Sequence, residues 1–321
     1  MTTPSAGERA ALDAPGSRRH RSRPVVSLVT CARLPEPDAD AELLLESLIA
    51  AKLDATWVAW DDAPVAALGP TTVLRSTWNY YRDLPAFLSW VNASETTTSL
   101  WNPAPVVRWN AHKGYLSTLA ERGLPVVPTI LVPRGDVRAL GEWVDAHPTL
   151  RDAEDLVVKP AVSAGSFRTE RGSTATLGAH FASLVRDGDT LIQPYQHEVT
   201  TSGERCLIVL DGEVTHAVRK SPRFSTDAES ITRVQPSDAE RALALAIVAT
   251  IPHPLLYARV DLIDDGAGNL RLMELELIEP SLFLNTSTEG LWRFVDLIAT
   301  RARSGNSSRR RNGNEGEDFG E

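Results

Sequence analysis

The sequence predicts an α/β protein that begins with an open parallel sheet. Strand and helix signals alternate there: residues 24–30 form a buried apolar run, residues 41–53 have a helical pattern, and residues 56–60 and 71–75 are two further strands. Strands separated by one helix or by a loop are typical of such a sheet. Because ligands bind beyond the carboxyl ends of parallel strands, we expect the segment RSTWNYYRD (75–83) at the edge of a site.

The bulk composition excludes several classes of protein. A chain of 321 residues is long enough for roughly two or three compact domains. Its net charge of −9 argues against a general nucleic-acid-binding protein. No apolar run approaches the about 20 residues of a membrane span, and no secretion signal is visible. We therefore expect a cytoplasmic protein, monomer or homodimer, without nucleic-acid or membrane partners.

The chain ends and the two cysteines have simple interpretations. The ends, residues 1–23 and 304–321, are predicted to be disordered tails because they lack the apolar residues that offset ordering entropy. Their basic clusters could touch nucleic acid or acidic lipid, but we interpret them as solvated. Cys31 and Cys206 are expected to be buried thiols, although the sequence leaves one disulfide open.

Two segments beside the predicted sheet could bind anions. Arg75, with Ser76 beside it, could hold a substrate carboxylate through two parallel hydrogen bonds, but pairing of Arg75 with a nearby Asp is equally open. Residues 101–109 contain two prolines and are predicted to be an interdomain linker. Asn110 would cap a helix that ends near Arg122, with Gly123 after it and Lys113 in its first turn. A lysine there is disfavoured by the helix dipole unless a phosphate lies nearby.

The central part of the chain contains further phosphate-binding candidates. A strand ends at Lys159 and is followed by a loop of small residues, SAGS (163–166), whose N–H groups could approach the same anion. Pro194 interrupts the strand LIQPYQ, which would leave backbone groups free to bind an adenine edge. A hairpin with an Asp-Gly turn follows, and Arg219 and Lys220 at the end of its second strand are available to phosphates.

The segment 257–283 contains the strongest chemical signal. Its turn DDGAGN lies between two alternating strands, and the symmetric register pairs Asp261 with Glu274 and Arg259 with Glu276. The two-residue period of a strand places these four side chains on one face. The opposite, apolar face would consist of Val260, Leu262, Met273, Leu275 and Leu277.

Three carboxylates with one arginine on one sheet face repel each other. Hard divalent cations would neutralise Asp261, Glu274 and Glu276, and two magnesium ions could bridge them to ATP phosphates. A solvated acidic face is the simpler alternative. The concentration of like charge favours the metal site.

In order and spacing, these motifs resemble the ATP-grasp superfamily, which includes glutathione synthetase and D-alanine–D-alanine ligase, over roughly residues 25–300. The resemblance implies an ATP-grasp α/β fold, in which a Rossmann-like N-terminal domain precedes two α+β subdomains that clasp ATP. The implied units are a tail at 1–23, the N-terminal domain at 24–105, subdomain A at 106–190, subdomain B at 191–303 and a tail at 304–321.

The resemblance also implies roles for individual residues. Lys113 and Lys159 correspond to the two nucleotide lysines, and Ser163, Gly165 and Ser166 belong to the loop over the phosphates. Gln193, Pro194 and Tyr195 correspond to the adenine hinge, and Glu204 in GER follows it as a nucleotide residue. Asp261, Glu274 and Glu276 match the metal positions, and Arg259 acts with Lys159 in catalysis. The family usually has Glu-x-Asn where this chain has Glu-x-Glu, which puts the metal coordination in doubt. The phosphate loop of the family also contains more glycine than the loop of this chain.

The family implies an ADP-forming ligase that makes a carbon–nitrogen bond. It would activate a small amino-acid-derived carboxylate as an acyl phosphate for attack by nitrogen. RSTWNYY, WNPAPVVRWNAHKGYL and MELELIEPSLFL are similar to a bacterial subgroup that includes the cycloserine-forming ligase, which closes O-ureido-D-serine into a ring during antibiotic biosynthesis. An intermolecular amino-acid or peptide ligase and a non-catalytic ATP-binding scaffold are the alternatives.

Overall fold

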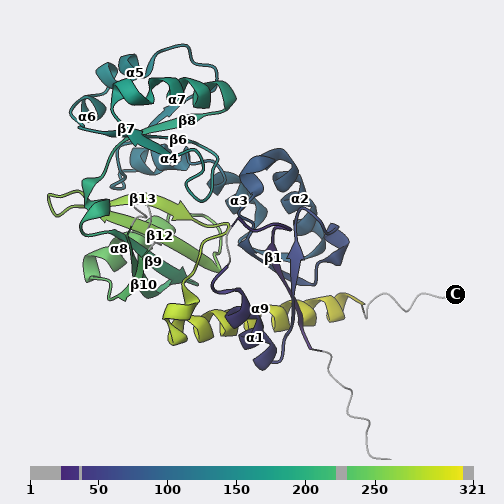
Figure 1. Ribbon diagram of the computed structural model, residues 1–321. Coiled ribbons are helices and arrows are strands. Elements are labelled where there is room, and N and C mark those ends of the chain that lie inside the picture. The colour runs from purple at the N-terminus through teal and green to yellow at the C-terminus, as the bar shows by residue number, and fades with distance from the viewer. Residues whose placement is uncertain (1–22, 36–37, 222–229, 314–321) are drawn as a thin grey trace, which may run out of the picture.

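The computed structural model describes residues 23–35, 38–221 and 230–313 (Figure 1). The predicted tail at residues 1–23 therefore lies outside the described residues except for Arg23, and so does the end of the other tail, 314–321. The described residues contain three sheets, of which one is parallel and two are antiparallel.

The N-terminal unit contains the predicted parallel sheet, and the expected strands and helix are confirmed. Its strand order is β2-β1-β3-β4. The elements are β1 (Val25–Thr30), α1 (Ala41–Ala50), β2 (Asp54–Ala59), η1 (Val65–Ala67), β3 (Thr71–Ser76), η2 (Tyr80–Arg82), α2 (Leu84–Thr97) and β4 (Ser99–Trp101).

The predicted linker at 101–109 is wrong, because α3 (Ala104–Asn110) occupies most of it. The two prolines precede or fall in the first turn of this helix, where a missing N–H breaks no helical hydrogen bond. Asn110 ends α3 instead of capping the next helix, α4 (Tyr115–Glu121). Lys113 lies in the turn before α4, not in its first turn. Gly123 has φ +82° just beyond α4, as predicted.

A second unit lies at the top of Figure 1 and carries an antiparallel sheet in the order β5-β8-β6-β7. Its apolar core lies between this sheet and α5 and α7. The elements are β5 (Ile130–Val132), α5 (Leu140–Ala146), α6 (Pro148–Arg151), β6 (Leu156–Pro160), β7 (Glu170–Gly172), α7 (Thr174–Asp187) and β8 (Thr190–Pro194).

The third unit is built on an antiparallel sheet in the order β11-β10-β9-β12-β13. The predicted Asp211-Gly212 turn is confirmed, with φ +53° and +81°, as a two-residue hairpin of this kind requires. The elements are η3 (His197–Thr200), β9 (Glu204–Leu210), β10 (Glu213–Ser221), β11 (Ser230–Val234), α8 (Asp238–Val248), β12 (Tyr257–Asp264), β13 (Leu270–Glu276) and η4 (Leu284–Thr286).

The β12–β13 hairpin has the predicted register where the charged residues lie. Arg259 pairs with Glu276, and Asp261 pairs with Glu274. The two-residue period therefore does bring all four side chains to one face.

The register shifts by one residue immediately after Asp261, so that Leu262 pairs with Leu272. Met273 is the extra residue of this bulge. The prediction that Met273 lies on the apolar face is wrong: Met273 is partly exposed, and Leu272 takes its place in the core. The other four predicted apolar positions are confirmed as buried: Val260, Leu262, Leu275 and Leu277.

Helix α9 (Thr288–Gly313) joins the third unit to the N-terminal sheet (Figure 1). One apolar cluster contains Leu28 of β1, Ile208 of β9, and Phe294 and Ile298 of α9. The predicted start of the C-terminal tail at residue 304 is not the end of the helix, which continues to Gly313. In the described part of the chain, none of the helices combines the length and apolar character needed to cross a bilayer.

Side chains bind the outer edge of β13 at Leu275 and Leu277, whereas at Leu272 the backbone of Pro125 and Val127 does so. Asn110 Nδ2 donates to the Leu275 carbonyl at 2.8 Å, and Asn110 Oδ1 accepts from the Leu277 N–H at 2.8 Å. Asn102 Nδ2 donates to the Leu277 carbonyl at 2.8 Å, and the Leu275 N–H donates to the Tyr115 hydroxyl at 3.0 Å. These bonds attach the carboxylate-bearing strand to α3 and α4.

We expect Asn110→Ala to lower the free energy of unfolding by on the order of 2–4 kcal/mol, because each buried polar group left unpaired costs about 1–3 kcal/mol. Asn92→Ala, at an exposed position of α2, is the control and should change stability by less than about 0.5 kcal/mol. Urea denaturation followed by circular dichroism measures both. Equal stability of the two variants would contradict this account of the β13 edge.

Gly290, in the first turns of α9, packs against the buried ring of His216. A Cβ added there would lie 2.5 Å from His216 Nδ1 and 2.7 Å from Cε1. The ring cannot move freely, because Nε2 lies 2.8 Å from the Leu282 carbonyl and Nδ1 lies 2.9 Å from Thr215 Oγ1. The absence of a side chain at Gly290 therefore allows α9 to pack closely against His216 of β10.

Gly290→Ala should lower the free energy of unfolding by about 1–3 kcal/mol through this overlap. Gly178→Ala is the matched control: it also lies inside a helix, α7, but its new Cβ would have no atom within 4 Å. It should raise stability by about 0.5–1 kcal/mol, since alanine restricts the unfolded chain. If both variants gain stability in urea denaturation, the predicted overlap is absent.

Candidate active site

The β12–β13 hairpin gathers the central residues of the site. Arg259 Nε donates to Asp261 Oδ1 at 2.9 Å, and Arg259 Nη2 donates to Asp261 Oδ2 at 2.9 Å. The same Nη2 donates to Glu276 Oε1 at 2.5 Å, and Nη1 reaches the Ser281 carbonyl at 3.3 Å. One guanidinium therefore holds two of the three carboxylates that the sequence predicts as metal ligands.

Lys113 binds the third carboxylate. Its Nζ lies 2.7 Å from Glu274 Oε1 and donates to the Ser163 carbonyl at 2.9 Å. Its backbone N–H donates to the Ala161 carbonyl at 2.7 Å. The turn before α4 thus attaches the hairpin to the loop that follows β6.

The charges in this cluster do not balance evenly. Burial would raise the pKa of Glu274, but Lys113 and Lys159 more than offset it and lower that pKa to about 2. Burial raises the pKa of Glu276 to about 7; Arg259 opposes this, and Glu274 and Asp261 add to it. Burial lowers the pKa of Lys159, although Glu274 favours its charged form. Negative charge therefore remains uncompensated around Glu276.

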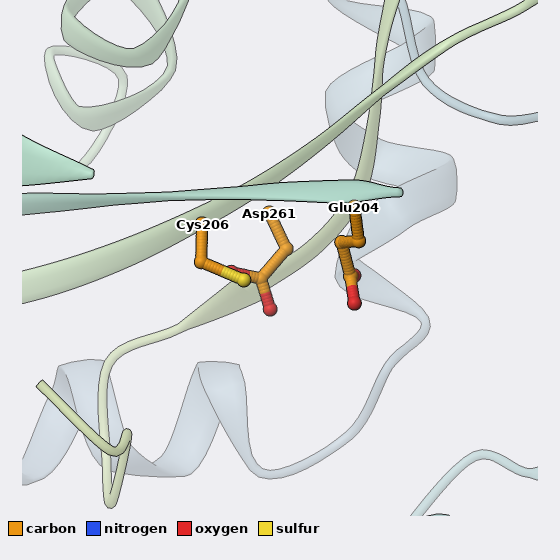
Figure 2. A group of neighbouring side chains, drawn as sticks. All are labelled: Glu204, Cys206 and Asp261. Atoms are coloured by element: carbon orange, nitrogen blue, oxygen red, sulfur yellow. The ribbon is translucent and has the colours of Figure 1, made fainter. Parts of the chain in front are cut away.

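A second acidic group adjoins Asp261. Glu204 and Cys206 lie on β9 next to Asp261 of β12, and one ligand atom from each lies within 4.8 Å of the others (Figure 2). Burial, together with Asp261, raises the pKa of Glu204 to about 7, although Lys220 Nζ lies 4.0 Å from its carboxylate. Cys206 is a fully buried free thiol. The expectation of buried thiols is confirmed for it and for Cys31, which lies in another core cluster.

By donor type these residues suit a hard divalent cation, although among the described residues only Glu204, Cys206 and Asp261 bring three ligand atoms within 4.8 Å of one another. Asp261, Glu274 and Glu276 offer carboxylate oxygens on one face, which are the ligands that magnesium prefers. Burial raises the pKa of Glu276 despite Arg259, and repulsion from Glu274 and Asp261 adds to the rise. A bound cation would remove this repulsion.

The predicted phosphate loop lies beside Lys113. Ser163 is buried and its carbonyl accepts the Lys113 bond. Gly165 and Ser166 are exposed and have φ +58° and +59°, a conformation that glycine adopts without strain. The Phe167 ring lies 4.6 Å from the Tyr81 ring, which attaches the end of the loop to the N-terminal unit.

The predicted hinge, Gln193 to Tyr195, ends β8. The Tyr195 N–H already donates to the Asp155 carbonyl at 2.9 Å, so this particular group is not free for adenine. The Gln193 side chain donates to Thr129 Oγ1 at 2.8 Å, and Pro194 pairs with Leu156 of β6. The side chain of Gln193 and the strand position of Pro194 therefore stabilise the second unit.

The remaining predicted residues lie farther from the cluster. Arg219 is exposed on β10. Ser76 is buried and its hydroxyl donates to Thr30 Oγ1 at 3.0 Å. Arg75 is 2% exposed and donates to the Pro280 carbonyl at 2.9 Å. Among the described residues Arg75 has no ion pair, so the expected pairing with an Asp is absent.

The segment 75–83 does lie at the edge of a hollow, as predicted. A cavity of about 720 Å³ in the N-terminal unit is lined by Trp60, Asp61, Asn79, Arg82 and Asp83, among others. It lies at the carboxyl ends of β2 and β3, where parallel sheets bind ligands. The hairpin carboxylates do not line it.

Sequence reasoning missed three kinds of residue. Asn102 and Asn110 occur in two Trp-Asn pairs, but nothing in the sequence shows that they bind β13. Cys206 was assigned only to the core, although it lies beside Asp261 (Figure 2). Glu279 follows Glu276 by three residues and is nine-tenths buried, with 9% exposed. The spacing Glu274-x-Glu276-x-x-Glu279 was the available signal.

Comparison with known proteins agrees with this geometry. A family model described as the N-terminal domain of the D-cycloserine synthetase DcsG matches residues 26–102. The cycloserine biosynthesis protein DcsG of Streptomyces lavendulae is 32% identical over 299 residues, which cover 87% of this chain and 99% of that protein.

Solved structures give the same result. The crystal structure of D-cycloserine synthetase DcsG superposes with a TM-score of 0.78 at 30% identity, covering 87% of this chain and 99% of the other. The ATP-grasp ligase PsnB, in complex with a minimal precursor, has a TM-score of 0.61 at 18% identity, covering 86% and 98%. D-alanine–D-alanine ligase from Bacillus anthracis, solved with ATP, has a TM-score of 0.63 at 13% identity, covering 89% and 99%. With the predicted fold and resemblance thus confirmed, the chain belongs to the DcsG family of ATP-grasp ligases.

Proposed function

We propose that this chain is an ADP-forming ligase that activates a small amino-acid-derived carboxylate as an acyl phosphate for attack by nitrogen. The substrate we propose is O-ureido-D-serine, with attack from within the same molecule to close the cycloserine ring. Membership of the DcsG family supports this substrate. The single observation that carries the reaction type is the convergence of Lys113, Arg259 and three carboxylates at one end of the β12–β13 hairpin.

ATP would bind between the second and third units. Lys113 and Lys159 would contact its phosphates under the loop of Ser163, Gly165 and Ser166. The backbone of Gln193, Pro194 and Tyr195 would lie along the adenine, and Glu204 would face the nucleotide. Lys220, half-buried beside Glu204, and Arg219 would add positive charge.

Asp261, Glu274 and Glu276 would hold magnesium, which we propose as two ions. Magnesium held by these residues would supply positive charge that neutralises phosphate oxygens. D-alanine–D-alanine ligase has been solved with ATP, and PsnB with magnesium and ADP. Glu276 at the position where the family usually has Asn gives this site one more negative charge.

The chemistry depends on positioning and charge. A substrate carboxylate oxygen attacks the γ-phosphorus, the bond to the β-phosphate oxygen breaks, and ADP leaves. Arg259, with Lys159, stabilises the transferring group. The nitrogen then attacks the acyl carbon, loses a proton, and phosphate departs with the electron pair of its carbon–oxygen bond. In O-ureido-D-serine this ring nitrogen still carries a carbamoyl group, so water must cleave that group, which leaves as ammonia and carbon dioxide, to give cycloserine. Closure of the loop that Phe167 attaches to Tyr81 would exclude water from the acyl phosphate.

Arg75 and Ser76 belong to the substrate side of this proposal. Arg75 binds the Pro280 carbonyl, so its effect on substrate would pass through the segment after β13. An intermolecular ligase is the rival enzyme, and a nucleotide-binding scaffold is the rival of another class. Conversion of one compound alone into a cyclic product would exclude the first, and any substrate-dependent ADP release would exclude the second.

The test is magnesium-dependent ADP release from ATP across O-ureido-D-serine, amino acids and dipeptides. We expect release with O-ureido-D-serine, and a loss of at least about 100-fold in kcat/KM with Glu274→Gln, because one metal carboxylate and the Lys113 ion pair disappear together. Glu121→Gln, exposed at the end of α4, is the control and should retain activity. Release with a different substrate would overturn the substrate, and full activity of Glu274→Gln would overturn the site.

A further inference from the structure

The segment after β13 connects the N-terminal unit to the carboxylate cluster. The Glu279 carbonyl accepts from Trp78 Nε1 at 2.9 Å, and the Pro280 carbonyl accepts from Arg75 Nη2 at 2.9 Å. One residue farther, the Ser281 carbonyl accepts from Arg259 Nη1 at 3.3 Å. The backbone at Glu279 and at the two residues after it is therefore held in place, by two residues of RSTWNYYRD and by Arg259.

The Glu279 carboxylate has no such bonds. It is nine-tenths buried, and among the described residues it makes no hydrogen bond and no ion pair. The three carboxylates of the hairpin differ in this respect, because each contacts Lys113 or Arg259. A buried acid without a partner avoids the cost of an unpaired charge by staying neutral, and a cationic partner from outside the chain would allow it to ionise.

The surroundings of Glu279 identify the chemistry of that partner. Burial, and then the charge of Glu276, raises the pKa of Glu279 well above its ordinary value, while Lys113 opposes this. Burial, and then the charge of Glu279, raises the pKa of Tyr80. Glu279 thus follows β13 and its carboxylates in the chain, and its backbone carbonyl is bound by Trp78 of the N-terminal unit.

A small cation suits this position better than a further metal ion. Magnesium takes most of its ligands from water and phosphate and needs only one or two carboxylates, which the hairpin already offers. Glu279 is a single carboxylate, which binds an ammonium group through its charge and by accepting its hydrogen bonds.

We propose that Glu279 binds the ammonium group of the amino-acid-derived substrate. It would hold the adjacent substrate carboxylate toward Arg259, which its own segment contacts through Ser281. This inference rests on the proposed function and deepens it, because it selects amino acids over carboxylates that lack the amine.

The test is calorimetric binding to the full chain in the presence of ADP and magnesium, with two probes. One is O-ureido-D-serine, and the other is the same compound with hydrogen in place of its amino group. In the unaltered protein the amino compound should bind on the order of 10- to 100-fold more tightly, as for hydrogen bonds to charged groups. Glu279→Gln should remove most of that difference and leave binding of the deaminated compound unchanged.

Glu121→Gln is again the control, with binding of ADP and magnesium measured for every variant. Glu279→Asp retains the charge but shortens the side chain, so it should show a smaller loss and gives the answer if Glu279→Gln does not fold. Weaker ADP and magnesium binding with unchanged probe preference would make Glu279 a metal carboxylate and overturn the proposal. Equal binding of both probes to the unaltered protein, or no binding of the amino compound, would overturn it as well.

The two proposals can fail separately. Glu279-dependent preference for the amine without ADP release would refute the ligase function and leave the ammonium site intact. Equal ADP release with the amino compound and the deaminated compound would support the ligase function and refute the ammonium site.

Discussion

The structure of the site depends on how the outer edge of β13 is held. An edge strand exposes unpaired N–H and C=O groups, and here Asn110, Asn102 and Tyr115 satisfy those of Leu275 and Leu277. Asn102 also accepts from the Leu256 N–H at 2.8 Å, so the same side chain contacts the start of β12. Side chains can satisfy this edge without adding a strand, which leaves the face with the carboxylates open.

This arrangement has an electrostatic consequence. Glu274 and Glu276 flank Leu275, whose backbone is bound on its outer side, so the two carboxylates cannot move apart to reduce their repulsion. Lys113 and Arg259 compensate for part of it. Fixed, partly uncompensated negative charge favours a divalent cation, because little reorganisation is then needed when the cation binds.

The N-terminal unit contributes to the site mainly through backbone contacts. Arg75 and Trp78 donate to the carbonyls of Pro280 and Glu279, and the Phe167 ring meets Tyr81. The segment 75–83 is therefore in contact both with the segment that follows β13 and with the end of the loop after β6. Changes in this segment would reach both places through these contacts.

The sequence by itself determined the fold class, the hairpins and the shared face of Arg259, Asp261, Glu274 and Glu276, because strand period and turn residues are local properties. Tertiary structure decided the rest. The bulge at Met273, the helix in place of the expected linker and the partners of Asn110 depend on packing between segments far apart in the chain. The ion pairs of Lys113 with Glu274 and of Arg259 with Glu276 form only when those segments come together. The same holds for Glu279, which has no ion pair among the described residues.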